Sequence, residues 1–278
     1  MKETVKVPTG IEGMDALLNG GFPKDTVNLI SGPPGSGRSL FCMHFIYSGV
    51  ENYEEPGLYI TLEEDHASLV KAMKSFGQRP EIYEEEGDLV LADLGWLSKA
   101  MGPAQEAPAG LAGMDILREK GRASGVDMDW LRNGSDAHDE LEKGFVGFRT
   151  LRDIVSHMVE KKAIKRLAVD SVAAIGLMYG SAEVFRKELF TFGRFLREKK
   201  LTSVVVTEGT GATGAVRFGV EQFLCDTHIC LNLRILKGEA MRTVTVQKMR
   251  FGSHDSGVHP FAITSRGIEI NTREFVRV

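Results

Sequence analysis

A glycine-rich segment close to the N-terminus carries residue types that can bind phosphate groups. The segment reads Gly32-Pro33-Pro34-Gly35-Ser36-Gly37-Arg38-Ser39 and continues into Leu40. Glycines at this Walker A spacing let successive backbone N–H groups point inward, where they form a nest for phosphate oxygens. The helix expected after the loop adds the positive end of its dipole. The segment therefore predicts a site for a nucleoside triphosphate, and ATP is the expected nucleotide.

The last two side chains of the loop have expected roles of their own. Loops of this kind place a serine or threonine hydroxyl on Mg²⁺, and Ser39 holds that position. The preceding position normally carries a lysine that reaches the β- and γ-phosphates, but here it is Arg38. A guanidinium can still pair with phosphate, yet it is too wide for the compact position of an ammonium. We expect binding to persist and hydrolysis to be slow.

Three acidic residues follow expected strands and are candidates for metal binding and catalysis. Asp170 ends the apolar stretch 166–170, where it is expected to hold the metal through its water shell; the alternative is a turn or helix-capping aspartate. Glu63 and Glu64 follow the stretch 58–62. Because the chemistry of a parallel sheet gathers at the carboxyl ends of its strands, one of these two is expected to activate a water molecule. The alternative for the pair is solvated surface charge.

The elements that must position these residues indicate an α/β protein. Helical segments, among them 40–50 and 183–200, alternate with apolar strands, the pattern of a mainly parallel central sheet with flanking helices. After residue 228 the pattern becomes that of a C-terminal antiparallel meander. A single domain over residues 1–278 is expected. The predicted strands span residues 26–31, 58–62, 88–92, 166–170, 203–207, 228–236 and 242–251, with a further pair in 261–270.

One long segment interrupts this order. Residues 94–145, approximately, are rich in glycine, alanine, proline and acidic side chains and contain only short helical patterns. A connection of this length without secondary structure is unusual inside a compact domain. We interpret it as an insertion, either a lid or contact segment or a mobile loop.

Composition narrows the function class. Of the 278 residues, 42% are hydrophobic and 26% are charged, as in ordinary globular proteins. The net charge of −4 does not favour a polyanionic partner. Three cysteines are too few for a disulfide framework. No apolar stretch has the length of a signal peptide or a membrane span, so a cytoplasmic location without membrane contact is expected.

The motifs and their order resemble the KaiC-like branch of the RecA ATPases, and the resemblance spans nearly the whole chain. It implies a RecA-like P-loop NTPase fold and a homo-oligomeric ring, usually a hexamer, with ATP and Mg²⁺ bound between subunits. Besides the loop, it rests on the blocks Thr9–Asp15, Gly20–Pro23, Glu63-Glu64, Ser75–Gly77, Asp170-Ser171, Lys248-Met249-Arg250, Ser253-His254 and Pro260-Phe261.

The resemblance also implies roles for residues outside the loop. Glu63 or Glu64 activates water, and Ser75 lies near the adenine. The adjacent subunit contributes a basic strand, Lys248-Met249-Arg250, and places His254 and Thr264 near the base or ribose. Without the resemblance, the alternation of Lys248 and Arg250 is equally well explained by a solvated strand face.

Three functions remain open at this stage. The first is an ATP-binding, slowly hydrolysing ring protein that regulates an unidentified protein partner. The second is a recombinase-like, DNA-associated ATPase, suggested by the shared RecA fold; the densest basic run, 161–166, is better explained by the preference of helix C-termini for cations. The third is a nucleotide-stabilised scaffold without turnover. Because the sequence contains one phosphate loop, the self-phosphorylation of two-domain clock proteins is not expected here.

Overall fold

The computed structural model describes residues 4–95, 137, 140, 146–210, 215, 216, 219, 221–236 and 239–276. The insertion expected at about 94–145 lies outside the described residues, apart from 94, 95, 137 and 140.

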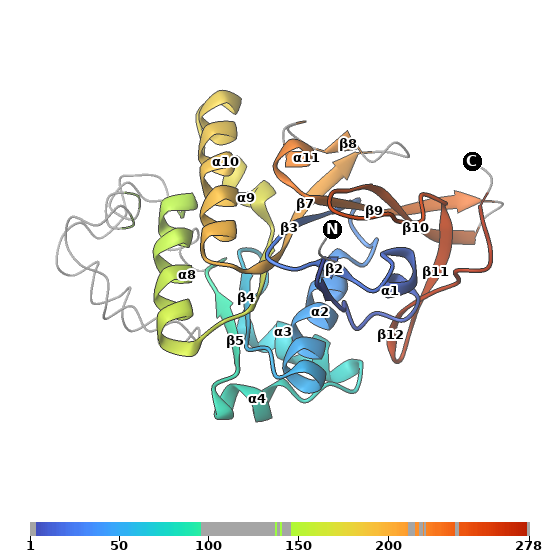
Figure 1. Cartoon of the computed structure of the whole chain (residues 1–278), viewed down its shortest axis with the longest axis horizontal. Helices are drawn as coiled ribbons and strands as arrows, with labels where there is room; N and C mark the ends of the chain where they lie inside the picture. Colours follow the sequence, from blue (N-terminus) through green and yellow to red (C-terminus); the bar gives the residue numbers. More distant parts are fainter. Residues whose placement is uncertain are drawn as a thin grey trace.

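The described part of the chain is built on a ten-stranded β-sheet (Figure 1). Its strands are β3 (Val27–Gly32), β4 (Gly57–Thr61), β5 (Leu89–Asp93), β6 (Arg166–Asp170), β7 (Thr202–Thr210), β8 (Ala215–Val216), β9 (Thr227–Leu236), β10 (Glu239–Met249), β11 (His259–Thr264) and β12 (Gly267–Ile270). The strand order is β12-β11-β10-β9-β3-β7-β6-β4-β5, and β8 pairs with β7. Neighbours from β9 to β5 are parallel, whereas β9 to β12 are antiparallel. This confirms the predicted α/β fold with its C-terminal meander.

Helices cover both faces of the sheet because residues along the parallel strands alternate between two hydrophobic cores. Leu58 and Ile60 of β4 join a core formed with α8, α9 and α10, whereas Tyr59 faces a core formed with α1, α2 and α3. The helices are α1 (Met14–Leu17), α2 (Arg38–Tyr53), α3 (His66–Ser75), α4 (Pro80–Glu86), α8 (Phe148–Lys162), α9 (Val172–Gly176), α10 (Ala182–Glu198) and α11 (Glu221–Leu224). Burial on both faces explains why these strands are continuous apolar runs.

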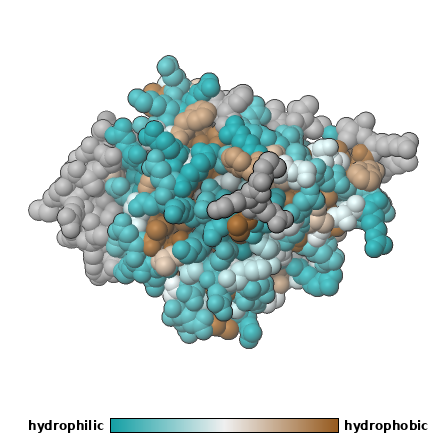
Figure 2. Space-filling model, viewed as in Figure 1, coloured by the Kyte–Doolittle hydropathy of each residue, from teal (hydrophilic) through white to brown (hydrophobic). Residues whose placement is uncertain are grey.

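The molecular surface is mainly hydrophilic on the face shown in Figure 2, with scattered apolar patches. None of the described helices is long and apolar enough to cross a membrane.

Several short elements were not anticipated. A small sheet of β1 (Lys6–Val7) and β2 (Phe22–Pro23) packs beside α1, and α9 and α11 are single helical turns. Segments of two to five residues are too short to show a hydrophobic period. Helix α2 is also longer than the predicted 40–50, because it begins directly at Arg38 of the loop.

Arg166, the last residue of the basic run 161–166, is buried at the start of β6. Its side chain is 0% exposed, and Nε donates to Glu55 Oε2 at 2.6 Å. Nη1 donates to the carbonyl oxygens of Pro8 and Phe45, both at 2.9 Å. The guanidinium therefore stabilises the core and is not available as part of a basic surface for DNA.

Candidate nucleotide-binding site

The loop between β3 and α2 has the backbone conformation that a phosphate nest requires. Gly35 has φ +77° and Gly37 has φ +95°, values in the left-handed region that side chains disfavour. At Gly32, a Cβ atom would collide with the carbonyl oxygen of Leu231 and the hydroxyl of Ser36. The glycines are thus required by the path of the chain.

Ser36 tests whether this loop fits a phosphate. Its side chain is completely buried, and its Oγ has no hydrogen-bond partner among the described residues. A buried hydroxyl without a partner is destabilising by about 1–3 kcal/mol. A phosphate oxygen held in the loop would supply that partner, so the residues present fit the predicted ligand.

Asp170, the last residue of β6, lies next to the loop. The hydroxyl groups of Ser39 and Tyr59 form hydrogen bonds to its carboxylate, the latter at 2.8 Å. Burial raises the pKa of Asp170, while the hydrogen bonds from Ser39 and Tyr59 lower it. A hydroxyl and a carboxylate are hard oxygen ligands suited to Mg²⁺. Within the described residues, no group of three or more His, Cys, Asp or Glu side chains could hold a metal ion by itself.

Glu63 and Glu64 lie at the same edge of the sheet, since Thr61 of β4 is aligned with Asp170 of β6. Thr61 Oγ1 accepts hydrogen bonds from both of their backbone N–H groups, at 3.3 Å and 3.0 Å. The hydroxyl of Ser171 donates to Glu63 Oε1 at 2.8 Å. Burial, followed by the charges of Asp170, Glu63 and Asp65, raises the pKa of Glu64. Because a raised pKa makes a carboxylate a stronger base, Glu64 is the better candidate for proton transfer.

Arg38 turns toward the neighbouring strand β7. Its Nη1 donates to the carbonyl oxygen of Thr207 at 2.8 Å. Its charge also lowers the pKa of Asp170, so the guanidinium lies within the cluster of site residues. In this arrangement the cation of the loop is hydrogen-bonded to the protein's own backbone.

The basic residues expected to contact nucleotide lie near the end of the sheet where β3 begins, whereas the loop follows the end of β3. Met249 of β10 is aligned with Thr227 of β9, which is aligned with Asn28 of β3. Four residues of β3 then lead from Asn28 to Gly32, a distance of about 13 Å at the usual rise of a strand.

Lys248 and Arg250 have polar partners outside the loop. Lys248 Nζ donates to the carbonyl oxygens of Gln222 and Cys225, at 3.2 Å and 2.7 Å. Arg250 Nη1 lies 3.5 Å from Asp226 Oδ1. Within the chain, both cations thus contact groups outside the loop.

Ser75 and Thr264 are brought to one side of the molecule through His44 of α2. Phe76, the residue after Ser75, has its ring 6.2 Å from the ring of His44. The His44 ring also contacts Gly267, which is aligned with Thr264 across the hairpin of β11 and β12. Ser75 itself is exposed and donates to the carbonyl of Ala72 at 2.7 Å, while Thr264 donates to Glu269 Oε1 at 2.6 Å.

Of the remaining predicted residues, Leu40 directly continues the loop, whereas Met249 and His254 belong to β10 and the segment that follows it. Leu40 is buried in the first turn of α2, and the side chain of Met249 packs in the core. His254 follows β10 at the opposite edge of the sheet, where the neighbouring Ser253 accepts hydrogen bonds from Asn19.

A buried histidine beside the loop was missed in the sequence. His228 Nε2 lies 2.8 Å from the hydroxyl of Ser31, the residue before Gly32, and its cross-strand neighbour is Lys248. Burial, followed by the charge of Lys248, lowers the pKa of His228 to about 4. The only available sign was a histidine in an otherwise apolar stretch, a pattern that core positions and surface positions share.

We predict that His228 makes the fold sensitive to mild acid. The pKa is about 4 in the folded state and 6.5 in the unfolded chain, so the unfolded chain binds the proton more readily between these values. The free energy of unfolding is therefore at its full value above pH 6.5 and decreases as the pH falls toward 4, by up to about 3 kcal/mol. His228→Gln should weaken this dependence, measured by urea unfolding at a series of pH values. Equal slopes for the wild type, His228→Gln and the control His254→Gln would contradict the assignment.

Comparisons with known sequences identify the family of the chain. A profile of the family described as "ATPase: KaiC" matches residues 7–110 and 111–274. The circadian clock oscillator protein KaiC of Parathermosynechococcus lividus is 32% identical over 267 residues, which cover 95% of this chain and 42% of that protein. For KaiC of Synechococcus elongatus the identity is 30% over 267 residues, covering 95% and 44%. The chain thus spans less than half the length of these relatives.

A solved structure supports the same assignment. The crystal structure of a KaiC-like protein from the hyperthermophilic archaeon Pyrococcus horikoshii matches with a TM-score of 0.73 and 28% identity, covering 96% of this chain and 99% of the other. This match confirms the RecA-like fold expected from the sequence. Since the family profile extends from residue 7 to residue 274, the chain belongs to the KaiC family of ATPases.

Proposed function

We propose that this protein binds ATP and Mg²⁺ between the subunits of a homo-oligomeric ring, hydrolyses ATP slowly, and uses the nucleotide state to regulate a protein partner. The observation that carries the proposal is the separation of the two basic residues from the loop. Lys248 and Arg250 lie at one edge of the sheet, and the loop with Ser39 and Asp170 lies at the other. A neighbouring copy can bring the two halves together, and repetition of such a head-to-tail contact closes a ring. Family resemblance favours a hexamer.

Each half of the proposed site has a distinct task. The loop binds the phosphates through its N–H groups, and Ser39 and Asp170 would hold Mg²⁺, which supplies positive charge for the phosphate oxygens. Glu64 accepts the proton of the attacking water, and Glu63 is held beside Asp170 by Ser171. Lys248 and Arg250 of the adjacent subunit stabilise the charge that develops on the phosphates.

The base and ribose have their own proposed contacts. Ser75 and Thr264 lie on one side of the molecule, so we assign both to the nucleotide held by their own loop. For Thr264 this differs from the contact with an adjacent subunit that the family resemblance implies. His254 belongs with the half that the neighbour supplies.

Slow turnover is proposed because Arg38 is bonded to the backbone of β7. A lysine at this position reaches the phosphates as a compact ammonium. Arg38→Lys is therefore expected to raise kcat by about tenfold, which corresponds to about 1.4 kcal/mol of transition-state stabilisation. Phosphate release at saturating ATP and Mg²⁺ measures this effect, and Arg273→Lys, at an exposed position, is the control. An unchanged or lower kcat would show that Arg38 does not limit the chemistry.

The proposal fails if purified protein does not bind ATP at micromolar concentration in the presence of Mg²⁺. A nucleotide-stabilised scaffold without turnover is the second candidate, because the same Arg38–Thr207 hydrogen bond also suits a site that only binds. A measurable ATPase rate that depends on Glu64 would exclude the scaffold. A DNA-stimulated rate would instead support the recombinase-like alternative, which the burial of Arg166 disfavours.

A further inference from the structure

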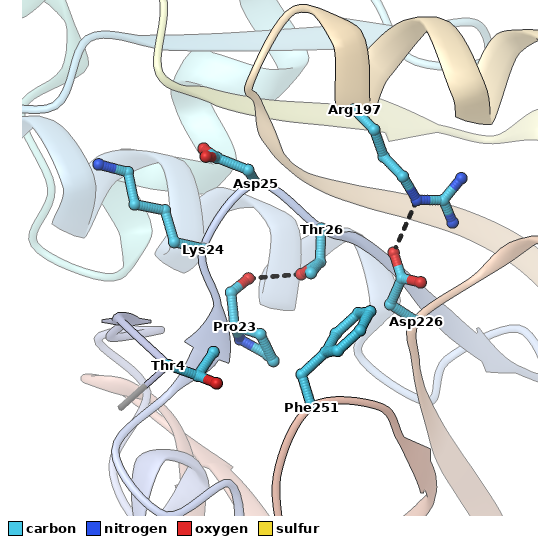
Figure 3. A pocket seen from close by; sticks show the side chains of 8 residues that line it. All are labelled: Thr4, Pro23, Lys24, Asp25, Thr26, Arg197, Asp226 and Phe251. Carbon is cyan, nitrogen blue, oxygen red and sulfur yellow. Dashed lines mark hydrogen bonds and ion pairs between the residues drawn. The ribbon is translucent and has the colours of Figure 1, made fainter. Parts of the chain in front are cut away.

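We propose that Asp226 positions Arg250 for the nucleotide of the neighbouring subunit, and that Arg197 shares the same carboxylate so that Arg250 stays available. This inference rests on the proposed function, in which Arg250 acts across a subunit contact. Asp226 lies between α11 and β9. Figure 3 shows its carboxylate facing Arg197, with the ring of Phe251 nearby.

Burial and several hydrogen bonds restrain the orientation of Asp226. The side chain is 3% exposed, and Oδ2 accepts hydrogen bonds from the backbone N–H of Val27 at 3.1 Å and from Arg197 Nε at 3.0 Å. Its backbone N–H donates to the carbonyl of Val27 at 2.7 Å, and its carbonyl accepts from the N–H of Arg250 at 2.8 Å. Oδ1 is thereby directed at the Arg250 guanidinium, 3.5 Å away.

The contact with Asp226 orients the Arg250 side chain but does not bury it. Its side chain is 51% exposed, so the guanidinium keeps a free side toward solvent. Fixing a long arginine side chain costs up to about 2 kcal/mol of rotamer entropy. Because the contact with Asp226 already restricts those rotamers, less entropy remains to be lost when Arg250 meets a phosphate.

Arg197 prevents Asp226 from holding Arg250 too firmly. Besides its contact with Asp226, Arg197 donates through Nη2 to the carbonyl of Leu224 at 2.7 Å, which fixes it in place. Two guanidinium groups on one carboxylate leave a net positive charge, which suits the approach of a polyphosphate. Without Arg197, the buried carboxylate would pair with Arg250 alone, and this stronger ion pair would draw the Arg250 guanidinium away from the nucleotide.

The cluster lies where a neighbour can reach it. A pocket of about 320 Å³, lined by residues that include Lys24, Arg197, Asp226 and Phe251, opens beside the carboxylate (Figure 3). Phe251 directly follows Arg250, and its side chain is 62% exposed. An exposed aromatic ring and a partly exposed guanidinium on consecutive residues are typical of a contact between proteins.

A double-mutant cycle tests the proposal. Asp226→Asn keeps the size of the side chain and an acceptor for Val27 but removes the charge. It is expected to lower kcat by about tenfold in the wild-type background and to have no further effect in Arg250→Ala, since interacting residues are non-additive. The nucleotide Kd should change by less than about twofold in both backgrounds. Oligomeric mass and thermal unfolding are measured for all four proteins, so that only folded assemblies of equal size are compared.

The outcomes separate the inference from the proposed function. If Arg250→Ala leaves kcat unchanged, the proposed role of Arg250 is wrong. If Arg250→Ala lowers kcat but Asp226→Asn lowers it equally in both backgrounds, Asp226 is merely structural and the inference is overturned. Should Asp226→Asn not fold, Arg197→Gln gives the same test: it must lower kcat when Arg250 is present and must have no effect when it is absent.

Discussion

Glu64→Gln should lower the rate of ATP hydrolysis by about a hundredfold or more, the usual contribution of a general base, while ATP binding persists. Glutamine has the shape of glutamate but cannot accept the proton of the attacking water. In the wild type, the rate should fall as the pH decreases through the raised pKa of Glu64, because only the carboxylate form is a base. The variant should lack this dependence. Phosphate release and calorimetric ATP binding measure the two effects.

Two companion variants decide how a result at Glu64 is interpreted. Glu85→Gln changes an exposed acid of α4 and should have wild-type activity. Glu63→Gln should be less severe, because Ser171 already occupies one of the Glu63 carboxylate oxygens. If Glu63→Gln abolishes turnover and Glu64→Gln does not, Glu63 is the general base. If neither variant changes a measurable rate, neither acid is the base.

Mixing two impaired proteins should restore activity. Asp170→Asn damages the half of the site that holds the metal, and Arg250→Ala damages the half that a neighbour contributes. In rings assembled at random from equal amounts of both, about one quarter of the head-to-tail contacts combine an intact loop with an intact Arg250. The expected rate is therefore about one quarter of the wild-type rate per subunit, measured after joint refolding or co-expression.

The matched control mixes Asp170→Asn with Glu64→Gln. Both changes affect the same half of the site, so no combination of these subunits contains a complete site and no activity should return. Recovery in this control would point to an effect other than complementation. Absence of recovery in the first mixture, with mixed oligomers demonstrated by mass, would mean that Arg250 does not act across a subunit contact.

Much of the fold was predictable because its signals are local. Apolar runs predicted β3, β4, β6 and the meander with bounds that differ from the structure by only a few residues, since both faces of the sheet are buried. The small β1–β2 sheet and the single-turn helices α9 and α11 were not predictable, because such short elements depend on what they pack against.

The sequence by itself determined where the candidate site lies, in the loop and in the acidic residues that follow the strands. These signals depend only on neighbours along the chain: the positions of the glycines, a serine at the start of a helix, and an acid after an apolar run. The strand order does not follow from such local signals, because it is set by packing between residues that are far apart in the sequence. It places β7 beside β3, where Thr207 meets Arg38. It also places Arg250 beside Asp226, at the end of the sheet where β3 begins, and this placement supports the proposal that an adjacent subunit supplies Arg250 to the nucleotide.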